Sequence, residues 1–236
     1  IMVGQLGDTS IASVGLANQI YFIVNLFLLG ISGGASMFIS QLWAKKDIKN
    51  IRRIQGLSLI VVISICILVI IPAAVFPAGI SVVFSVTLRN TGHQRIPLFA
   101  NLAGIITNTG LNYLLIFGKF GFPELGVAGA AIATVIARFV ECAIIVITVY
   151  AHKWPASAAM KEMLDLHKKL VKNFFSQSGL LITKDVLWAI GITAYMAIYA
   201  RMGKSEIAAV NILGPVIQLS TVFFSGIAMA CQIMVG

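Results

Sequence analysis

The chain has 236 residues, of which 59% are hydrophobic and only 11% are charged, and its mean hydropathy is +0.97. Because a soluble domain carries about 25% charged residues, this composition excludes a soluble globular protein and indicates an integral membrane protein. A formal net charge of +9 would be compatible with nucleic-acid binding, but in a membrane protein it is better explained by membrane orientation and by anionic lipid. We therefore expect no nucleic-acid partner.

Apolar stretches long enough to cross a bilayer recur along the chain. They cover residues 11–41, 54–88, 96–118, 125–151, 174–200 and 207–235. The stretches are continuous and lack the alternating segments of about ten residues that build a membrane barrel, so they predict helices. All three cysteines lie within them, where a free thiol behaves as a small hydrophobic group, and we expect no disulfide or metal site.

Basic residues gather in three of the connections between these stretches. Segments 42–53, 89–97 and 152–173 hold 12 of the 17 Lys and Arg residues, and together they carry the whole net charge of +9. Loops rich in Lys and Arg face the cytoplasm in membrane proteins. The pattern therefore predicts that these three loops lie on one side of the membrane, and that this side is cytoplasmic.

The stretch 54–88 conflicts with this orientation. As a single span it would place the basic loops before and after it on opposite sides of the membrane. As two spans, 57–71 and 78–88, each would be too short to cross. We therefore expect a helical hairpin that is shortened between Ile80 and Ser81; the alternative is one long kinked helix with inverted topology. The outer end of the earlier helix would be marked by Pro72, Pro77 and Gly79.

The two ends of the chain resemble each other. With a constant offset of 196 and no gap, residues 4–40 align with residues 200–236, and seven positions are identical, beginning with Gly7 and Gly203. Both copies would cross the membrane in the same direction. This predicts a parallel repeat, which in secondary transporters relates two lobes with a substrate path between them. Chance similarity between two apolar helices is the alternative.

Several motifs in a fixed order resemble the multidrug and toxic compound extrusion (MATE) family. They are GQLGDTSIASVGLANQI, SGGASMFISQLWAKKD, SVTLRNTGHQRIPLFANL, NYLLIFG, GVAGAAIATVIAR and AIYARMGKSEIAAVNI. The resemblance implies an all-α bundle of twelve membrane helices in two lobes of six. This chain would then be a partial one, from the end of helix 1 to the end of helix 8, with the hairpin of helices 3 and 4 shortened.

The same resemblance organises the chain into three parts. Residues 1–151 would form the N-terminal lobe and residues 174–236 the start of the C-terminal lobe, with helices 7 and 8. Between them, residues 152–173 alternate apolar and charged side chains at helical spacing, which predicts an amphipathic cytoplasmic linker helix at the membrane interface. The complete protein is expected to be a monomer in the plasma membrane of a bacterium or archaeon.

Asp185 is the main candidate for ion coupling. It lies about eleven residues into the stretch 174–200, which places it near mid-membrane at 1.5 Å per residue. An ionisable side chain there marks an ion or substrate path by default. The resemblance places Asp185 where many members carry a glutamate, and implies that it binds Na⁺ or H⁺; no other cofactor is expected. A carboxylate neutralised by a buried lysine or by water is the alternative.

Other polar residues inside the spans are candidates for a substrate cavity. Lys184 shares a helix face with Gln177 and Trp188, whereas it projects about 100 degrees away from Asp185, so these two neighbours are not an obvious pair. The side chains of Asn101, Asn108 and Asn112 share a helix face. They would line a cavity or, alternatively, hydrogen-bond neighbouring helices.

Arg138 and Glu141 are three residues apart on one predicted helix and can pair directly. Because removal of either side chain would leave the other charge unpaired inside the membrane, we interpret them first as a structural ion pair. Small residues recur at every fourth position in two places, at Gly30 and Gly34 and from Gly129 onward. This spacing lets neighbouring helices approach closely.

Enzyme motifs give little support for catalysis. Residues 30–34 spell G-x-S-x-G around Ser32, a pattern of serine hydrolases including intramembrane proteases, but the nucleophile needs a base within reach. The three histidines, His93, His152 and His167, all lie in the basic loops. No HExxH, Walker A or GxGxxG pattern occurs, so no enzyme is expected.

The sequence therefore predicts a cation-coupled antiporter that exports amphipathic, cationic drug-like compounds by alternating access. Its partners would be this small-molecule substrate and the lipid bilayer. A flippase for lipid-linked sugars from the same superfamily, and a membrane fragment that transports nothing, are the alternatives.

Overall fold

The computed structural model describes the backbone of residues 8–68, 72–121, 123–202, 217, 219–231 and 234. Side chains are described from residue 24 onward, except at 67–68, 72–75, 120, 160–161, 196–197, 199–200 and 202. Much of the predicted repeat, including Gly7 and Gly203, lies outside the described residues.

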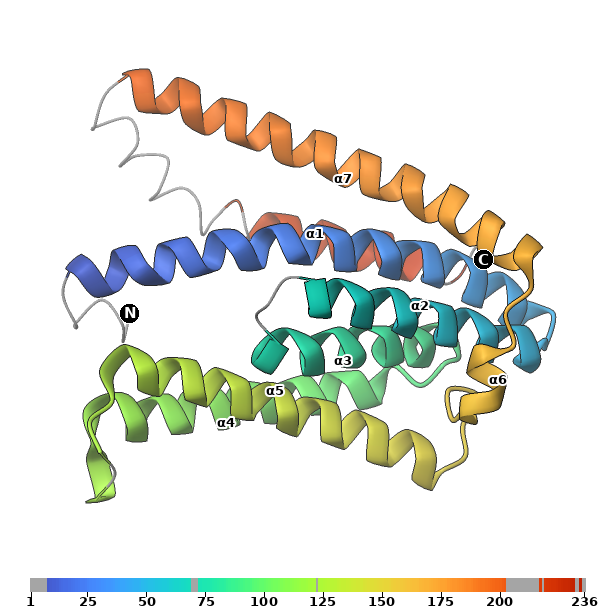
Figure 1. Ribbon diagram of the computed structural model, residues 1–236, viewed down its shortest axis with the longest axis horizontal. Helices are drawn as coiled ribbons and strands as arrows, with labels where there is room; N and C mark the ends of the chain where they lie inside the picture. Colours follow the sequence, from blue (N-terminus) through green and yellow to red (C-terminus); the bar gives the residue numbers. More distant parts are fainter. Residues whose placement is uncertain are drawn as a thin grey trace.

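The described residues are helical, without a strand among them, in agreement with the predicted all-α class. The long helices are α1 (Asp8–Ala44), α2 (Ile48–Leu68), α3 (Pro72–Asn90), α4 (Arg95–Phe117), α5 (Gly126–Ala151) and α7 (Lys168–Met202) (Figure 1). Two short helices, η2 (Lys119–Gly121) and α6 (Met160–Leu164), lie in connections, and a further apolar helical segment covers Leu219–Cys231.

The helices are stacked in the order α7, α1, α2 with α3, α5 and α4 (Figure 1). One buried core joins α1, α2 and α7 and includes Ile39, Ile54 and Phe174. A second core joins α3, α5 and the linker and includes Leu88 and Ile145. Helix α7 contacts the rest of the described bundle mainly through α1, so its other faces stay largely uncovered.

Glycines set the close contact between α1 and α7. A Cβ on Gly30 would overlap Ile182, and a Cβ on Gly34 would overlap the side chain of Ser178. Near the same contact the rings of Phe38 and Phe174 lie 6.3 Å apart. The two glycines therefore act as the small-residue spacing predicts, because only a bare backbone admits the neighbouring helix at this distance.

The stretch 54–88 forms two helices, so the alternative of one long kinked helix is wrong. Helix α2 ends at Leu68 and α3 begins at Pro72, where the missing N–H of proline costs no helical hydrogen bond. The expected helix end at Pro77 and Gly79 is also wrong. Pro77 lies inside α3, its carbonyl accepts a hydrogen bond of 2.8 Å from the Ser81 hydroxyl, and the helix continues through this point.

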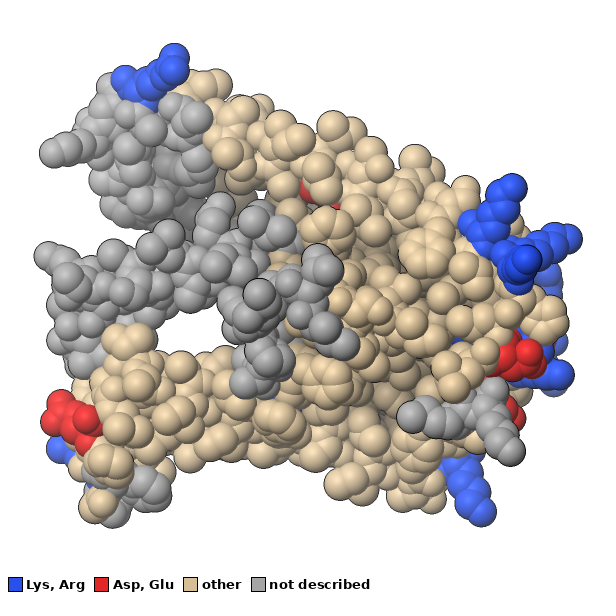
Figure 2. All heavy atoms as spheres, in the orientation of Figure 1, with Lys and Arg blue, Asp and Glu red and all other residues tan. Residues whose placement is uncertain are grey.

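The three basic loops meet at one end of the bundle, as the charge pattern predicts. Arg52, near the start of α2, pairs with Glu162 of the linker at 2.8 Å. The ring of His93, in the connection after α3, lies 4.1 Å from the ring of Trp154 in the linker. Figure 2 shows Lys and Arg gathered at this end, with few at the other.

The linker differs from the predicted single amphipathic helix. Its only described helix before α7 is α6, with five residues, and α7 already begins at Lys168. Met163 is buried against the bare backbone of Gly56 on α2, whereas the next residue, Leu164, is exposed. The linker is therefore held by specific contacts with α2, and these interrupt the helical pattern of its sequence.

Two described helical segments are long and apolar enough, by length and composition, to cross a membrane: Val24–Ala44 and Gly126–Ala151. Polar and charged side chains also lie inside the long helices, and those on α4 and α5 form the candidate site.

Candidate functional site: a polar groove between helices 4 and 5

A polar groove of about 310 Å³ lies between α4 and α5. It brings together side chains that sequence analysis had treated as two unrelated sets, the asparagines of α4 and the ion pair of α5. The groove is lined by Asn101, Gly104, Ile105, Asn108, Thr134, Ala137, Arg138 and Glu141.

Small residues make room for this groove. A Cβ on Gly129 would lie 2.6 Å from the Leu115 carbonyl oxygen, so the bare glycine lets α5 approach the backbone of α4. Opposite Glu141, a Cβ on Gly104 would lie 3.5 Å from the Glu141 Cβ. The absence of a side chain at Gly104 therefore leaves space beside the carboxylate.

Arg138 and Glu141 form an ion pair on α5. The Arg138 Nη1 atom donates to Glu141 Oε2 at 2.7 Å, and the side chains are 38% and 11% exposed, respectively. The carboxylate is thus the more enclosed partner, and the guanidinium reaches the open side of the groove. A charged pair inside an apolar bundle is costly and marks a functional or structural site.

The asparagines of α4 form a short hydrogen-bonded chain. The Asn112 side-chain nitrogen donates to Asn108 Oδ1 at 3.0 Å, and the Asn108 nitrogen donates to Thr134 Oγ1 across the helix interface at 3.3 Å. Asn101 and Asn108 line the groove, whereas Asn112 lies one turn beyond it. Asn108 therefore lines the groove and also hydrogen-bonds the neighbouring helix, whereas a role of these amides in binding substrate stays a prediction.

On α7, Lys184 and Asp185 form an ion pair with a distance of 2.9 Å between Nζ and Oδ1. Helical spacing did not make these neighbours an obvious pair, but they do pair, because the long lysine side chain can fold back across the 100 degrees that separate them. The lysine side chain is 69% exposed and the aspartate 19%. The carboxylate is therefore shielded and neutralised by its neighbour in the chain.

Gln177 and Trp188 are exposed on α7, as is Lys184. They do not reach the groove between α4 and α5, and no described helix covers them. The predicted cavity candidates thus lie in two separate places: the asparagines in the groove, and the residues around Asp185 on an open face of α7.

Sequence analysis missed Thr134, which lies one turn before Arg138 and joins the groove to Asn108. It also missed a buried contact between Asn90 of α3 and Ser36 of α1, where the Asn90 nitrogen donates to the serine hydroxyl at 2.9 Å. The usable signal for Thr134 and Ser36 was a hydroxyl inside an apolar stretch, whereas Asn90 lies in the basic segment 89–97 and gave no such signal.

Ser32, the serine of the G-x-S-x-G pattern, is buried, and its hydroxyl donates to the Leu28 carbonyl at 2.5 Å. The described histidines lie at the basic end, where His152 Nδ1 contacts the Thr148 carbonyl at 3.0 Å. In the part of the chain that the structure describes, no cluster of three or more His, Cys, Asp or Glu residues could hold a metal ion.

Comparisons with known proteins agree with this architecture. A model of the MatE family matches residues 1–80. "Probable multidrug resistance protein NorM" of Thermotoga maritima is 28% identical over 233 residues, covering 82% of this chain and 50% of the relative. "Uncharacterized transporter YisQ" of Bacillus subtilis is 26% identical over 270 residues, covering 100% of this chain and 58% of the relative.

A solved structure shares the fold. The crystal structure of a mutant of the Vibrio cholerae MATE transporter VcmN superposes with a TM-score of 0.71 at 18% sequence identity, covering 98% of this chain and 57% of that chain. The chain thus spans about half the length of the curated relatives it matches. Taken together, the match of residues 1–80 to the family model, the NorM and YisQ relatives and the shared all-helical fold show that this chain is similar to MATE transporters over nearly its whole length.

Proposed function

We propose that the complete protein is a cation-coupled antiporter that exports amphipathic, cationic drug-like compounds by alternating access. The observation that carries this proposal is the groove between α4 and α5, where Asn101, Asn108 and the pair of Arg138 and Glu141 gather between two largely apolar helices. Polar and charged side chains within membrane helices mark substrate or ion paths. The NorM relatives, named as multidrug resistance proteins, support the substrate class.

The groove suits a mixed polar and apolar ligand. Ile105 and Ala137 offer apolar surface, while Asn101 and Asn108 offer amide groups for hydrogen bonds. Because Arg138 neutralises Glu141, the pair adds polarity to the groove without a net charge. An amphipathic compound is the ligand that this balance favours.

Asp185 is the proposed coupling residue. In this structure its carboxylate is held by Lys184, so a Na⁺ ion or a proton that binds Asp185 would displace the lysine and change the charge on this face of α7. Coupling requires that the ion bind with different affinity in the two orientations of the carrier. We propose that Lys184 is paired with Asp185 in one orientation and free in the other, which would supply such a difference in ion affinity.

The contact between α1 and α7 supports a conformational assignment. The contacts through Gly30, Gly34 and Phe38 lie in the half of α1 nearer the basic loops, and the two helices diverge toward the other end (Figure 1). If the basic end faces the cytoplasm, the described state is closed on the cytoplasmic side. We assign it to the outward-facing half of the cycle, in a monomer of a bacterial or archaeal plasma membrane.

The alternative of a flippase for lipid-linked sugars would need a cavity rich in free cations. Arg138 is the cation that lines the groove, and it is paired with Glu141. The groove therefore favours the drug exporter over the flippase.

The proposal is tested with the complete protein in sealed vesicles. Addition of an amphipathic cationic drug should drive efflux of Na⁺ or H⁺, and Asp185→Asn should abolish this coupled flux. The control is Glu124→Gln, which changes an exposed carboxylate at the end of the bundle away from the basic loops and should leave the flux unchanged. Unaltered coupling in Asp185→Asn would remove Asp185 from the mechanism. Absence of drug transport under either ion gradient would overturn the proposed function as a whole.

A further inference from the structure

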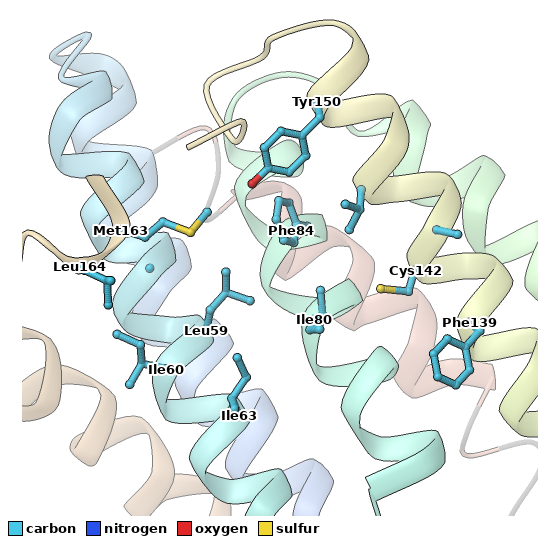
Figure 3. Close-up of a pocket in the computed structure, with 13 residues that line it drawn as sticks. Leu59, Ile60, Ile63, Ile80, Phe84, Phe139, Cys142, Tyr150, Met163 and Leu164 are labelled. Atoms are coloured by element: carbon cyan, nitrogen blue, oxygen red, sulfur yellow. The ribbon is translucent and has the colours of Figure 1, made fainter. Parts of the chain in front are cut away.

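A second, larger groove of about 580 Å³ lies between α2 and α5, with α3 at its back and α6 at one end. Figure 3 shows side chains of α2 and α5 facing each other across it. Its lining is almost wholly apolar and includes Leu59, Ile63, Phe84, Phe139 and Met163. This groove is separate from the polar groove between α4 and α5.

The groove opens sideways, toward the surface that a bilayer would cover. Ile60 on one wall is 38% exposed and Phe139 on the other is 53% exposed. Leu164 of α6, at the linker end, is 63% exposed. An open apolar groove of this kind on a membrane helix bundle fits a flexible hydrocarbon chain.

Positive charge lies at the linker end of the groove. Arg52 and Arg53 stand one helical turn before Gly56, the first groove residue of α2. Each arginine is paired with one linker carboxylate. Lys49, one turn earlier, is exposed and has no ion pair among the described residues. Three cations against two carboxylates leave this rim positive.

We propose that the groove binds one acyl chain of an anionic phospholipid, whose headgroup lies at the rim formed by Lys49, Arg52 and Arg53. Basic sites at the cytoplasmic ends of membrane helices attract anionic headgroups, and the apolar lining takes the hydrocarbon. The positive rim disfavours a cationic drug at this place. A lipid site here is independent of the proposed transport activity, because it rests on charge and shape alone.

The site is tested on the complete protein by native mass spectrometry after addition of phosphatidylglycerol or phosphatidylcholine. The wild type should retain phosphatidylglycerol in preference to phosphatidylcholine. Ala143→Phe, which fills the groove from α5, should lose the retained lipid, whereas Ala131→Phe, exposed on the same helix outside the groove, should keep it. Equal retention by these two variants, or no preference in the wild type, would overturn the proposal.

The headgroup contact has its own test. Lys49→Gln should lower the preference for phosphatidylglycerol about fivefold, as expected for the loss of one cation near an anionic headgroup. Lys119→Gln, at the opposite end of the bundle, should not change it. The same loss in both variants would mean that the preference reflects total charge, and would contradict a site at the rim.

A native thiol reports on occupancy of the groove. Cys142 lines it, while Cys66 is buried and Cys231 is exposed. In the complete protein, with Cys231 and any cysteine outside this sequence replaced by serine, maleimide should label Cys142 in detergent, and phosphatidylglycerol should slow the labelling. A Cys142 that is unreactive without lipid in a correctly folded, monodisperse protein would show that another protein segment covers the groove, which would also overturn the proposal.

Discussion

Arg52 near the start of α2 donates from Nη1 to both carboxylate oxygens of Glu162, at 2.9 and 2.8 Å, although 110 residues separate the two in sequence. Beside this pair, Arg53 binds Asp165, and the buried Gln55 donates from Nε2 to the Ala156 carbonyl at 2.9 Å. These contacts hold the linker against α2. A five-residue helix such as α6 is not stable by itself, so its conformation depends on them.

We therefore expect Glu162→Gln to loosen the linker in the complete protein. The neutral amide cannot form a charge-assisted pair with Arg52, so backbone amides of residues 156–166 should exchange hydrogen faster at neutral pH. Hydrogen exchange with mass spectrometry measures this directly. Glu124→Gln is the matched control, and equal exchange in both variants would show that the pair does not hold the linker.

The linker should also loosen in acid. The pKa of Glu162 is lowered by the backbone N–H of Ala159 and by Arg52, and the pKa of Asp165 is lowered by Arg53. A lowered carboxyl pKa stabilises the folded form at pH values above the ordinary carboxyl range, near 4, and this contribution is lost as pH falls through the lowered pKa.

Linker exchange, corrected for the intrinsic pH dependence of the exchange rate, should therefore stay constant from neutral pH down to the ordinary carboxyl range and rise below it. The double variant Asp165→Asn with Glu162→Gln should not show this rise in linker exchange at low pH. A rise that persists in the double variant would assign the acid response to other groups.

Gly34→Ala should destabilise the contact between α1 and α7. The added methyl would overlap Ser178, and overpacking at such a place costs about 1–3 kcal/mol. Gly110 on α4 is the matched control, since a Cβ there meets nothing within 4 Å and alanine is the better helix former by about 1 kcal/mol. Thermal unfolding of both variants in the same detergent checks the prediction, and a similar midpoint for the two would contradict the close contact.

The pair of Arg138 and Glu141 should show strong coupling in a double-mutant cycle of the free energy of unfolding. Arg138→Met leaves the enclosed carboxylate unpaired and should lower the free energy of unfolding by about 3 kcal/mol. Glu141→Gln should cost less, because the Arg138 side chain is 38% exposed and keeps some access to the open groove. The double variant should recover part of the loss, whereas simple addition of the two costs would show that the ion pair is not a unit.

Sequence alone was sufficient for properties that follow from local composition. Apolar length predicts helices in a bilayer, since each helix satisfies its backbone hydrogen bonds internally. The position of the helix breaks was less certain. Pro77 was expected to mark a helix end, yet it lies within α3. Proline removes one helical hydrogen bond, and the packing of α3 against α1, α2 and α5 offsets that cost.

The alignment with YisQ bears on the shortened hairpin. The alignment covers 270 positions, whereas the whole chain has 236 residues, a difference of 34. YisQ therefore carries at least that many residues with no counterpart in this chain. The proposed shortening near residues 80 and 81 would account for them. In the structure, residues 80 and 81 lie within α3, which begins at Pro72.

What the sequence determined by itself is the class of the protein, its apolar helices and the gathering of its basic loops at one end, because these depend on the kind of residue at each position. Only the tertiary structure decided which polar groups meet. The pairing of Arg52 with Glu162, and the joining of Asn108 to Thr134 beside Arg138 and Glu141, depend on which helix faces another and at what height. Helical periodicity specifies the face that a residue shares with its neighbours in the chain, but packing between helices selects its partner.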